Sequence, residues 1–166
     1  ARKLARTGHT HWTLPEIDFT DGPYLSENTT STTLTPSGTS GSVNITASAS
    51  TFASTDVGRL VSFNSGRAKI TGFTSATVVA ATTQVNFANT DAKTDWKLGA
   101  FSGTTGHPSC VSFFEQRLVF AGTISEPQTL YFSKAGDYEN MTTGTNADDA
   151  MVYTIASNQV NRIRYL

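Results

Sequence analysis

Turn-forming residues divide this chain into short segments in which polar and apolar residues alternate. Residues 42–47, for example, read Ser-Val-Asn-Ile-Thr-Ala, so that every second side chain is apolar. This period of two is typical of a half-buried strand, whereas no segment sustains the 3.6-residue period of an amphipathic helix. The pattern predicts an all-β fold with at most one short helical turn.

Composition supports the same fold class. The chain holds 28 Thr and 17 Ser among 166 residues, together with 13 Gly. Thr is favoured on exposed strand faces, and Ser and Gly are favoured in turns. Hydroxyl side chains are densest over residues 29–55, which we interpret as the solvated surface of a small β domain.

Charge and hydropathy exclude several protein classes. Twelve Lys and Arg face 13 Asp and Glu, so the chain is not a basic nucleic-acid binder. No apolar run approaches the ~20 residues of a membrane-spanning helix, and the basic N-terminus lacks the apolar stretch of a secretory signal. Because the chain starts without Met and ends within an expected strand, we expect it to be a piece of a longer protein.

Three sections follow from changes in composition. Residues 1–30 read as an irregular lead-in with a short strand at 11–14, and residues 31–100 read as a small antiparallel β barrel or sandwich. Turns in this section are expected at 64–66, at 74–76 and around Gly58. Its strands are expected at 42–47, 60–63, 67–73 and 77–81, with 84–87 continuing the last past a kink.

Residues 101–166 hold more aromatic residues and longer apolar alternation. Glu115-Gln116 is expected to turn a hairpin, and successive strands of this length are typical of a propeller blade or meander. We expect this section to begin a β-propeller that is completed beyond residue 166. Its strands are expected at 111–114, 117–121, 129–133, 151–155 and 160–164.

Candidate catalytic residues are few. Cys110 is the single cysteine, so it forms no internal disulfide, and we interpret it as a small buried hydrophobe. Cys110 or Ser109 with His107 forms the one conceivable nucleophile and base, but no strand–elbow–helix signature surrounds them. We therefore predict no catalytic residues, and keep a hydrolase built on these three as a rival.

Metal and cofactor sites are not predicted. His9 and His11 would share a strand face, yet no third ligand has a convincing spacing. The segment 18–22 lacks the ligand pattern of a calcium loop, and we interpret it as an acidic turn. Asp148 and Asp149 would point to opposite faces of a strand rather than share a site, so a solvated turn is preferred.

Aromatic residues have two interpretations. Trp12, Trp96 and the five Tyr could form a sugar-binding platform. Core packing is the preferred interpretation of a second set, which fall mostly on the apolar phase of their strands: Phe113, Phe114, Phe120, Tyr131 and Phe132.

Three further residues have structural interpretations. Arg117 is expected to pair with Glu115 across the strand ends. Gly122 and Gly136 are expected where a side chain does not fit.

The second half of the chain resembles a known family. The motifs are GHPSCVSFFEQRLVFAGT over 106–123, SEPQTLYFSKAGDYEN over 125–140, and DDA to TIASNQVNRI over 148–163. Upstream, DVGRLV at 56–61 and TDWKLGA at 94–100 also fit. These stretches resemble the central region of tail tubular protein B, the tail nozzle of short-tailed bacteriophages, and cover about two-thirds of the chain.

The resemblance implies a structural virion protein rather than an enzyme. The subunit would belong to a homo-oligomeric ring, a hexamer, in the phage tail below the portal and adaptor, with tail fibres or spikes as further partners. Genomic DNA would pass through its lumen into the host without sequence-specific binding. The family has no established catalytic residues to assign here.

One rival binding function stays open beside this interpretation. The Thr-, Ser- and Gly-rich section and its aromatic residues are also typical of a carbohydrate- or receptor-binding β module of a phage or bacterial surface protein.

Overall fold

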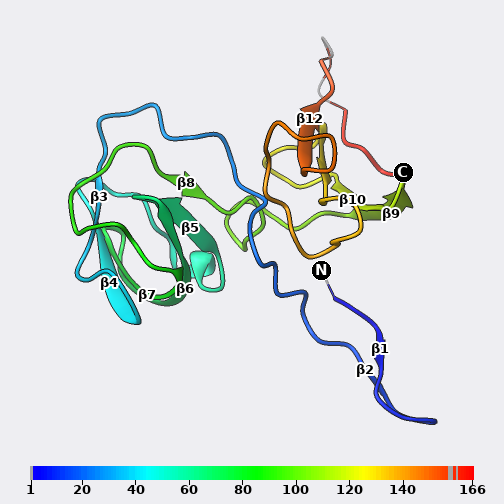
Figure 1. The fold of residues 1–166 in the computed structure, drawn as a ribbon. Coiled ribbons are helices and arrows are strands. Elements are labelled where there is room, and N and C mark those ends of the chain that lie inside the picture. Colours follow the sequence, from blue (N-terminus) through cyan, green and yellow to red (C-terminus); the bar gives the residue numbers. More distant parts are fainter. Residues whose placement is uncertain (1, 157–158, 160) are drawn as a thin grey trace. The chain divides into compact units, whose positions relative to one another are not determined.

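The computed structural model describes residues 2–156, 159 and 161–166. Within them every regular element is an antiparallel strand, apart from the 3₁₀ turn Ser54–Asp56 (Figure 1). The all-β fold class and its single helical turn are therefore confirmed. Among the described residues, no helix has the length and apolar character required to cross a bilayer.

Two compact units make up the chain. Residues 24–106 form one, called here the inserted unit, and the segments before and after it, 1–23 and 107–166, form the other, called the split unit. The expected lead-in over 1–30 is thus shared between the two. The first residues of the inserted unit pair with backbone near its end, since Tyr24 bridges Gly99 and Leu25 N donates to Leu98 O at 2.9 Å.

The inserted unit contains one six-stranded sheet with the order β3-β4-β7-β6-β5-β8. The turn expected at 74–76 lies instead at 76–77, because β6 continues through Ser75 with register shifts against β7. Gly58 has φ +91°, as a tight turn before β5 requires. The strands are β3 (Leu34–Pro36), β4 (Ser42–Ala47), β5 (Leu60–Phe63), β6 (Gly66–Ser75), β7 (Val78–Val85) and β8 (Lys97–Leu98).

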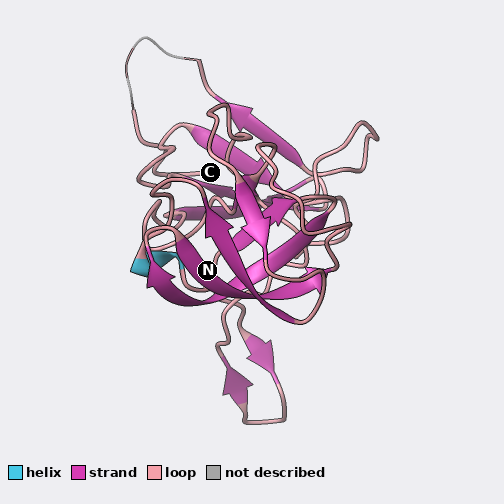
Figure 2. Cartoon of the chain, turned by 90° about the vertical axis from the view of Figure 1, so that its left-hand side faces the viewer, coloured by secondary structure: helices cyan, strands magenta, loops and turns pink. Residues whose placement is uncertain are grey.

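Residues 93–98 pair with both ends of this sheet, whose strands are among those drawn as magenta arrows in Figure 2. At one end Leu34 and Lys93 exchange two backbone hydrogen bonds, of 2.8 and 3.0 Å. At the other end β8 pairs with β5, where Leu98 faces Val61. The sheet therefore curls into a half-barrel around one interior.

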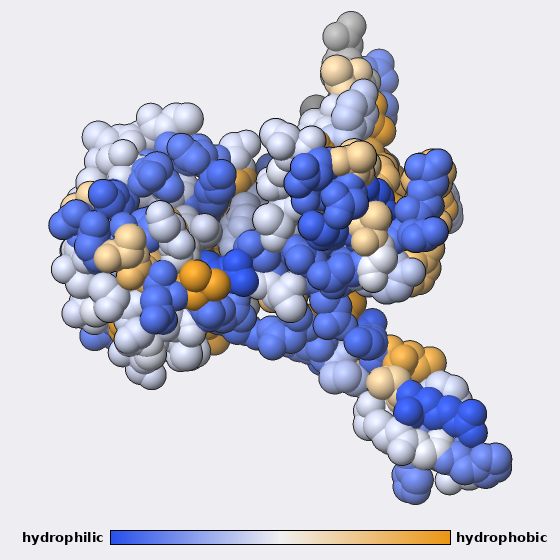
Figure 3. Space-filling model, in the orientation of Figure 1, coloured by the Kyte–Doolittle hydropathy of each residue, from blue (hydrophilic) through white to orange (hydrophobic). Residues whose placement is uncertain are grey.

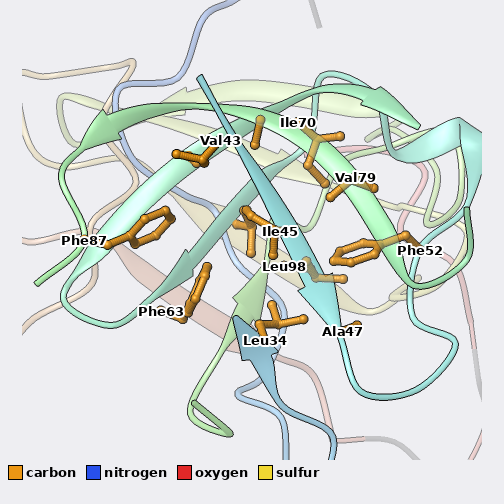
Figure 4. Close-up of a cluster of buried hydrophobic side chains, with 13 residues drawn as sticks. Leu34, Val43, Ile45, Ala47, Phe52, Phe63, Ile70, Val79, Phe87 and Leu98 are labelled. Atoms are coloured by element: carbon orange, nitrogen blue, oxygen red, sulfur yellow. The ribbon is translucent and has the colours of Figure 1, made fainter. Parts of the chain in front are cut away.

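Apolar side chains from every strand of the sheet fill that interior (Figure 4). In β4 the buried positions are Val43, Ile45 and Ala47, which alternate with exposed polar residues. Phe63 and Phe87 pack with ring centroids 4.5 Å apart. The face of this unit that Figure 3 shows is mostly pale and blue, in keeping with a sequence rich in Thr, Ser and Gly.

The split unit holds a four-stranded antiparallel meander with the order β9-β10-β11-β12, and a small hairpin formed by β1 and β2. Glu115 and Gln116 connect β9 to β10 with φ +46° and +61°, the left-handed pair that a two-residue hairpin turn needs. The strands are β1 (Ala5–Arg6), β2 (Trp12–Thr13), β9 (Cys110–Phe114), β10 (Arg117–Ala121), β11 (Thr129–Phe132) and β12 (Met151–Thr154).

The last strand expected from the sequence is not formed. Residues 161–164 have no strand pairing, and Val160 lies outside the described residues. Ile163 N donates to Pro127 O at 2.9 Å, and the Arg162 side chain donates to Gly122 O. Individual hydrogen bonds to loop carbonyls therefore take the place of the strand pairing that the alternation of residues 160–164 predicted.

Candidate functional site

The three candidate catalytic residues do not form a nucleophile–base pair. Ser109 Oγ donates to Gly122 O at 3.0 Å, and Cys110 Sγ donates to Ile163 O at 3.3 Å. His107 is exposed and has no side-chain hydrogen bond to any described residue. Cys110 is 8% exposed, which confirms the prediction of a small buried side chain.

The candidate metal ligands do not converge either. Across the described residues, no group of three or more His, Cys, Asp and Glu side chains lies close enough to hold a metal ion. His9 Nδ1 lies 3.2 Å from Arg6 Nη2, and Asp21 Oδ2 accepts a hydrogen bond from Thr142 Oγ1 at 2.9 Å. His9 thus contacts a residue of its own hairpin, and Asp21 links two segments that lie 121 residues apart in the sequence.

Arg117 has a role that the sequence did not predict. It is 6% exposed and donates to three backbone carbonyls, those of Ser133 (2.8 Å), Asp149 (2.6 Å) and Ala147 (2.6 Å). The expected pair with Glu115 is therefore wrong. The guanidinium has several donors in a planar fork, so one side chain can join β10 to the loop 147–149.

Asp148 and Asp149 lie in the expected turn, but they share a partner. Lys134 Nζ lies 3.4 Å from Asp148 Oδ2 and 3.2 Å from Asp149 Oδ1. The hydrogen bond from the Asn146 backbone, followed by that from Lys134, lowers the pKa of Asp149. The two carboxylates, Asp149 first, raise the pKa of Lys134. In a strand the two carboxylates would point to opposite faces and could not share a site. In the turn, both reach the ammonium group of Lys134.

The two glycines behave differently from each other. A Cβ on Gly122 would lie 2.5 Å from Ile163 O and 2.6 Å from Ser109 Oγ, which confirms that a side chain does not fit. A Cβ on Gly136 would meet nothing within 4 Å, so space is not the reason for that glycine. Its φ of +75° is the reason, since other residues rarely adopt that conformation.

Only part of the aromatic set is packed in a core. Phe120 and Tyr131 are buried and Phe132 is half-buried, but Phe113 and Phe114 are 67% and 59% exposed. The prediction of core packing is wrong for these two because they lie on β9, the edge strand of the meander. Phe113 instead packs edge-to-face on Tyr138, with centroids 5.2 Å apart.

An apolar cavity of about 490 Å³ lies within the split unit, against one face of β9 and β10. Its wall includes Val111, Phe113, Leu118 and Phe120, and Tyr138 closes one side. Residues near the N-terminus also line it, so sequence reasoning could not assemble it from one segment. An open apolar cavity of this kind is suited to receive another apolar side chain.

The two tryptophans occupy different settings. Trp12 lies on β2, is 58% exposed, and has the Arg6 guanidinium 5.7 Å from its ring centroid. Trp96 is half-buried against the core of the inserted unit, and its Nε1 donates to Thr32 O at 2.8 Å.

Comparison of the chain with protein-family models and with curated protein sequences finds no match.

Proposed function

We propose that this chain is part of a structural protein of a short-tailed bacteriophage tail, a subunit of the nozzle through which DNA is ejected. The proposal rests first on the resemblance of residues 106–140 and 148–163 to tail tubular protein B. The subunit would assemble with further copies into a ring of six, next to an adaptor protein and tail fibres or spikes.

One structural observation supports this assignment most. The motif residues build a four-stranded antiparallel meander, β9 to β12, and four-stranded sheets of this kind are the blades of β-propellers. Polar motif side chains such as Arg117 and Ser133 are used in hydrogen bonds that fix strands and loops. A motif whose polar residues maintain geometry in this way fits a structural protein better than an enzyme.

Exposed apolar residues on the edge strands support assembly. On β9, Val111 and Phe113 are 61% and 67% exposed, and on β12 Met151 and Tyr153 are 47% and 63% exposed. Apolar side chains gathered at sheet edges favour contact with further protein. Within the proposed nozzle, that protein would be a neighbouring blade or a neighbouring subunit.

The charge balance is compatible with DNA passage. Each Lys or Arg that contacts a phosphate adds salt-dependent affinity for DNA, so a strongly basic wall would retain the polymer. With 12 basic and 13 acidic residues, this chain would not hold DNA through its net charge.

Electron microscopy tests the proposal. The full-length gene product would be purified and imaged, and we expect it to form closed rings. Val111→Ser combined with Phe113→Ser should lower the ring fraction, whereas Phe73→Ser, at an exposed position of β6, should leave it unchanged. Particles that remain monomeric under all conditions of salt and concentration would refute the nozzle assignment.

A further inference from the structure

A second cavity, a shallow one of about 430 Å³ that is open to solvent, lies entirely within the inserted unit. Its volume falls in the range of small-molecule sites. Residues from four parts of the unit line it, among them Ser26, Thr32, Ser50, Arg59 and Trp96. It therefore combines hydroxyl groups, one guanidinium and one indole in a single concave surface.

Arg59 offers unused hydrogen-bond donors at this cavity. The side chain is 3% exposed, its Nε donates to Gly99 O at 2.6 Å, and its Nη1 donates to Asp56 Oδ1 at 2.9 Å. Its Nη2 has no hydrogen bond to any described residue. That group can therefore donate to an acceptor atom of a ligand, as a charged hydrogen-bond donor.

Three hydroxyl groups at the cavity are also available. The side chains of Ser26, Thr32 and Ser50 make no hydrogen bond within the described part of the chain. The loop beside them is held rigidly, because Asn28 Nδ2 donates to the carbonyls of Thr30, Thr32 and Thr94 at 3.0, 3.2 and 2.9 Å. The hydroxyls of Ser26 and Thr32 thus lie beside a hydrogen-bonded loop, which lowers the entropic cost of binding.

Trp96 supplies an apolar surface in the same cavity. The hydrogen bond from its Nε1 to Thr32 O and its packing on the core fix the orientation of the ring. Leu25 and Leu98 extend the apolar lining. A fixed indole next to hydroxyl groups suits a ligand with one apolar face and a polar rim.

Charge decides between a neutral and an acidic ligand. Among the residues that the structure describes, Arg59 is the one charged residue that lines the cavity, and Asp56 already balances its charge. A carboxylate placed there would add a second, uncompensated negative charge to a buried pair. The lining therefore favours a neutral ligand.

We propose that this cavity binds a neutral pyranose sugar, with the Trp96 indole against the apolar face of the ring. The Arg59 Nη2 group and the hydroxyls of Ser26, Thr32 and Ser50 hydrogen-bond the sugar hydroxyls. The proposal does not depend on the nozzle assignment, since it concerns the inserted unit alone.

NMR titration of the full chain tests the site. The probes are the methyl glycosides of glucose, galactose and mannose, with methyl glucuronide as the charged counterpart of methyl glucoside. We expect at least one neutral glycoside to shift the Trp96 indole N–H and the Arg59 Nε–H signals, and methyl glucuronide to bind at least several-fold more weakly than methyl glucoside.

A matched pair of variants locates the binding. Ser26→Ala combined with Ser50→Ala removes two neutral hydrogen bonds without touching the core and should weaken binding by about tenfold or more. Ser40→Ala combined with Ser125→Ala, at exposed positions away from the cavity, should not change it. The proposal fails if no neutral glycoside shifts these signals, if the glucuronide binds as tightly as the glucoside, or if both double variants bind equally.

Discussion

Arg59 and Asp56 form an ion pair that is almost completely withdrawn from solvent, with 2.9 Å between Nη1 and Oδ1 and side chains 3% and 1% exposed. Asp56 also accepts hydrogen bonds from Ala53 N at 2.9 Å and from Thr104 Oγ1 at 2.7 Å. Burial lowers the pKa of Arg59, and the nearby carboxylate of Asp56 opposes that effect. This pair therefore joins the 3₁₀ turn to the end of the inserted unit.

Asp56→Asn should destabilise the inserted unit strongly. The substitution leaves the Arg59 charge buried without compensation, which costs about 3–5 kcal/mol of unfolding free energy. Urea unfolding measures this loss. Glu27→Gln is the control, because it breaks an exposed ion pair in which the Lys97 side chain is 43% exposed and the Glu27 side chain is 52% exposed. It should cost no more than about 1 kcal/mol of unfolding free energy. Equal losses in the two variants would contradict the role given to Asp56.

Arg117→Met should loosen the meander of the split unit. It removes three hydrogen bonds to carbonyls that are then left without partners, at about 1–3 kcal/mol for each group that stays buried. Amide hydrogen exchange should accelerate in β10 to β12 and stay unchanged in β4 to β7. Arg2→Lys, at a side chain 56% exposed, is the control and should shift stability by less than about 0.5 kcal/mol. Uniform acceleration in both units would rule out a local role.

Gly122→Ala and Gly136→Ala should differ although their backbones are alike. Both residues have positive φ, +74° and +75°, so each substitution costs about 1–2 kcal/mol from conformation. At Gly122 the new methyl group also collides with Ile163 O and Ser109 Oγ, and overpacking adds about 1–3 kcal/mol. Thermal unfolding of the two variants compares them directly. A Gly136 variant as unstable as the Gly122 variant would show that the collision is relieved without cost.

Tyr131 should make the split unit sensitive to alkaline pH. It is 1% exposed, and its hydroxyl donates to Glu126 Oε2 at 2.5 Å. Burial, and then the hydrogen bond to the Glu126 carboxylate, raise the pKa of Tyr131 well above its ordinary value. Above about pH 10 the unfolded state loses a proton that the folded state retains. The contribution of Tyr131 to the free energy of unfolding is therefore complete below that pH. It falls as the pH rises further, by up to about 1.4 kcal/mol per pH unit.

Urea unfolding at a series of alkaline pH values checks this expectation. Tyr131→Phe should flatten the decline, and Tyr165→Phe, at a side chain 90% exposed, should not. The same pH dependence in the wild type and in Tyr131→Phe would refute the contribution of Tyr131.

The local pattern of the chain predicts the strands well. β4 and β5 have the expected bounds, and Glu115-Gln116 turns the expected hairpin. These features depend on neighbours in the sequence, because alternation and turn residues act over a few positions. The assignment of the second half to a propeller depends on the family resemblance and stays a prediction.

Features that depend on distant parts of the chain could not be predicted in the same way. The alternating pattern of β9 predicts that Phe113 is buried. Its exposure follows from the edge position of the strand, which only the strand order reveals. The sequence predicts an exposed side chain for Arg117, because the carbonyls that accept its hydrogen bonds lie up to 32 residues away along the chain. The cavity at Trp96 could not be predicted either, although Trp96 is one of the candidate residues for a sugar-binding platform.

The chain order of the two units has a consequence for folding. Tyr24 and Gly99 are bridged, so folding of the inserted unit brings its first residue to a residue eight positions before His107, where the split unit resumes. The entropy lost on closing a loop grows with its length, and a folded insertion shortens the loop that residues 1–23 and 107–166 must close. During synthesis the inserted unit also emerges complete before β9 to β12 do. Translation order and chain entropy therefore favour the same pathway, in which the sheet of residues 24–106 forms before the split unit closes.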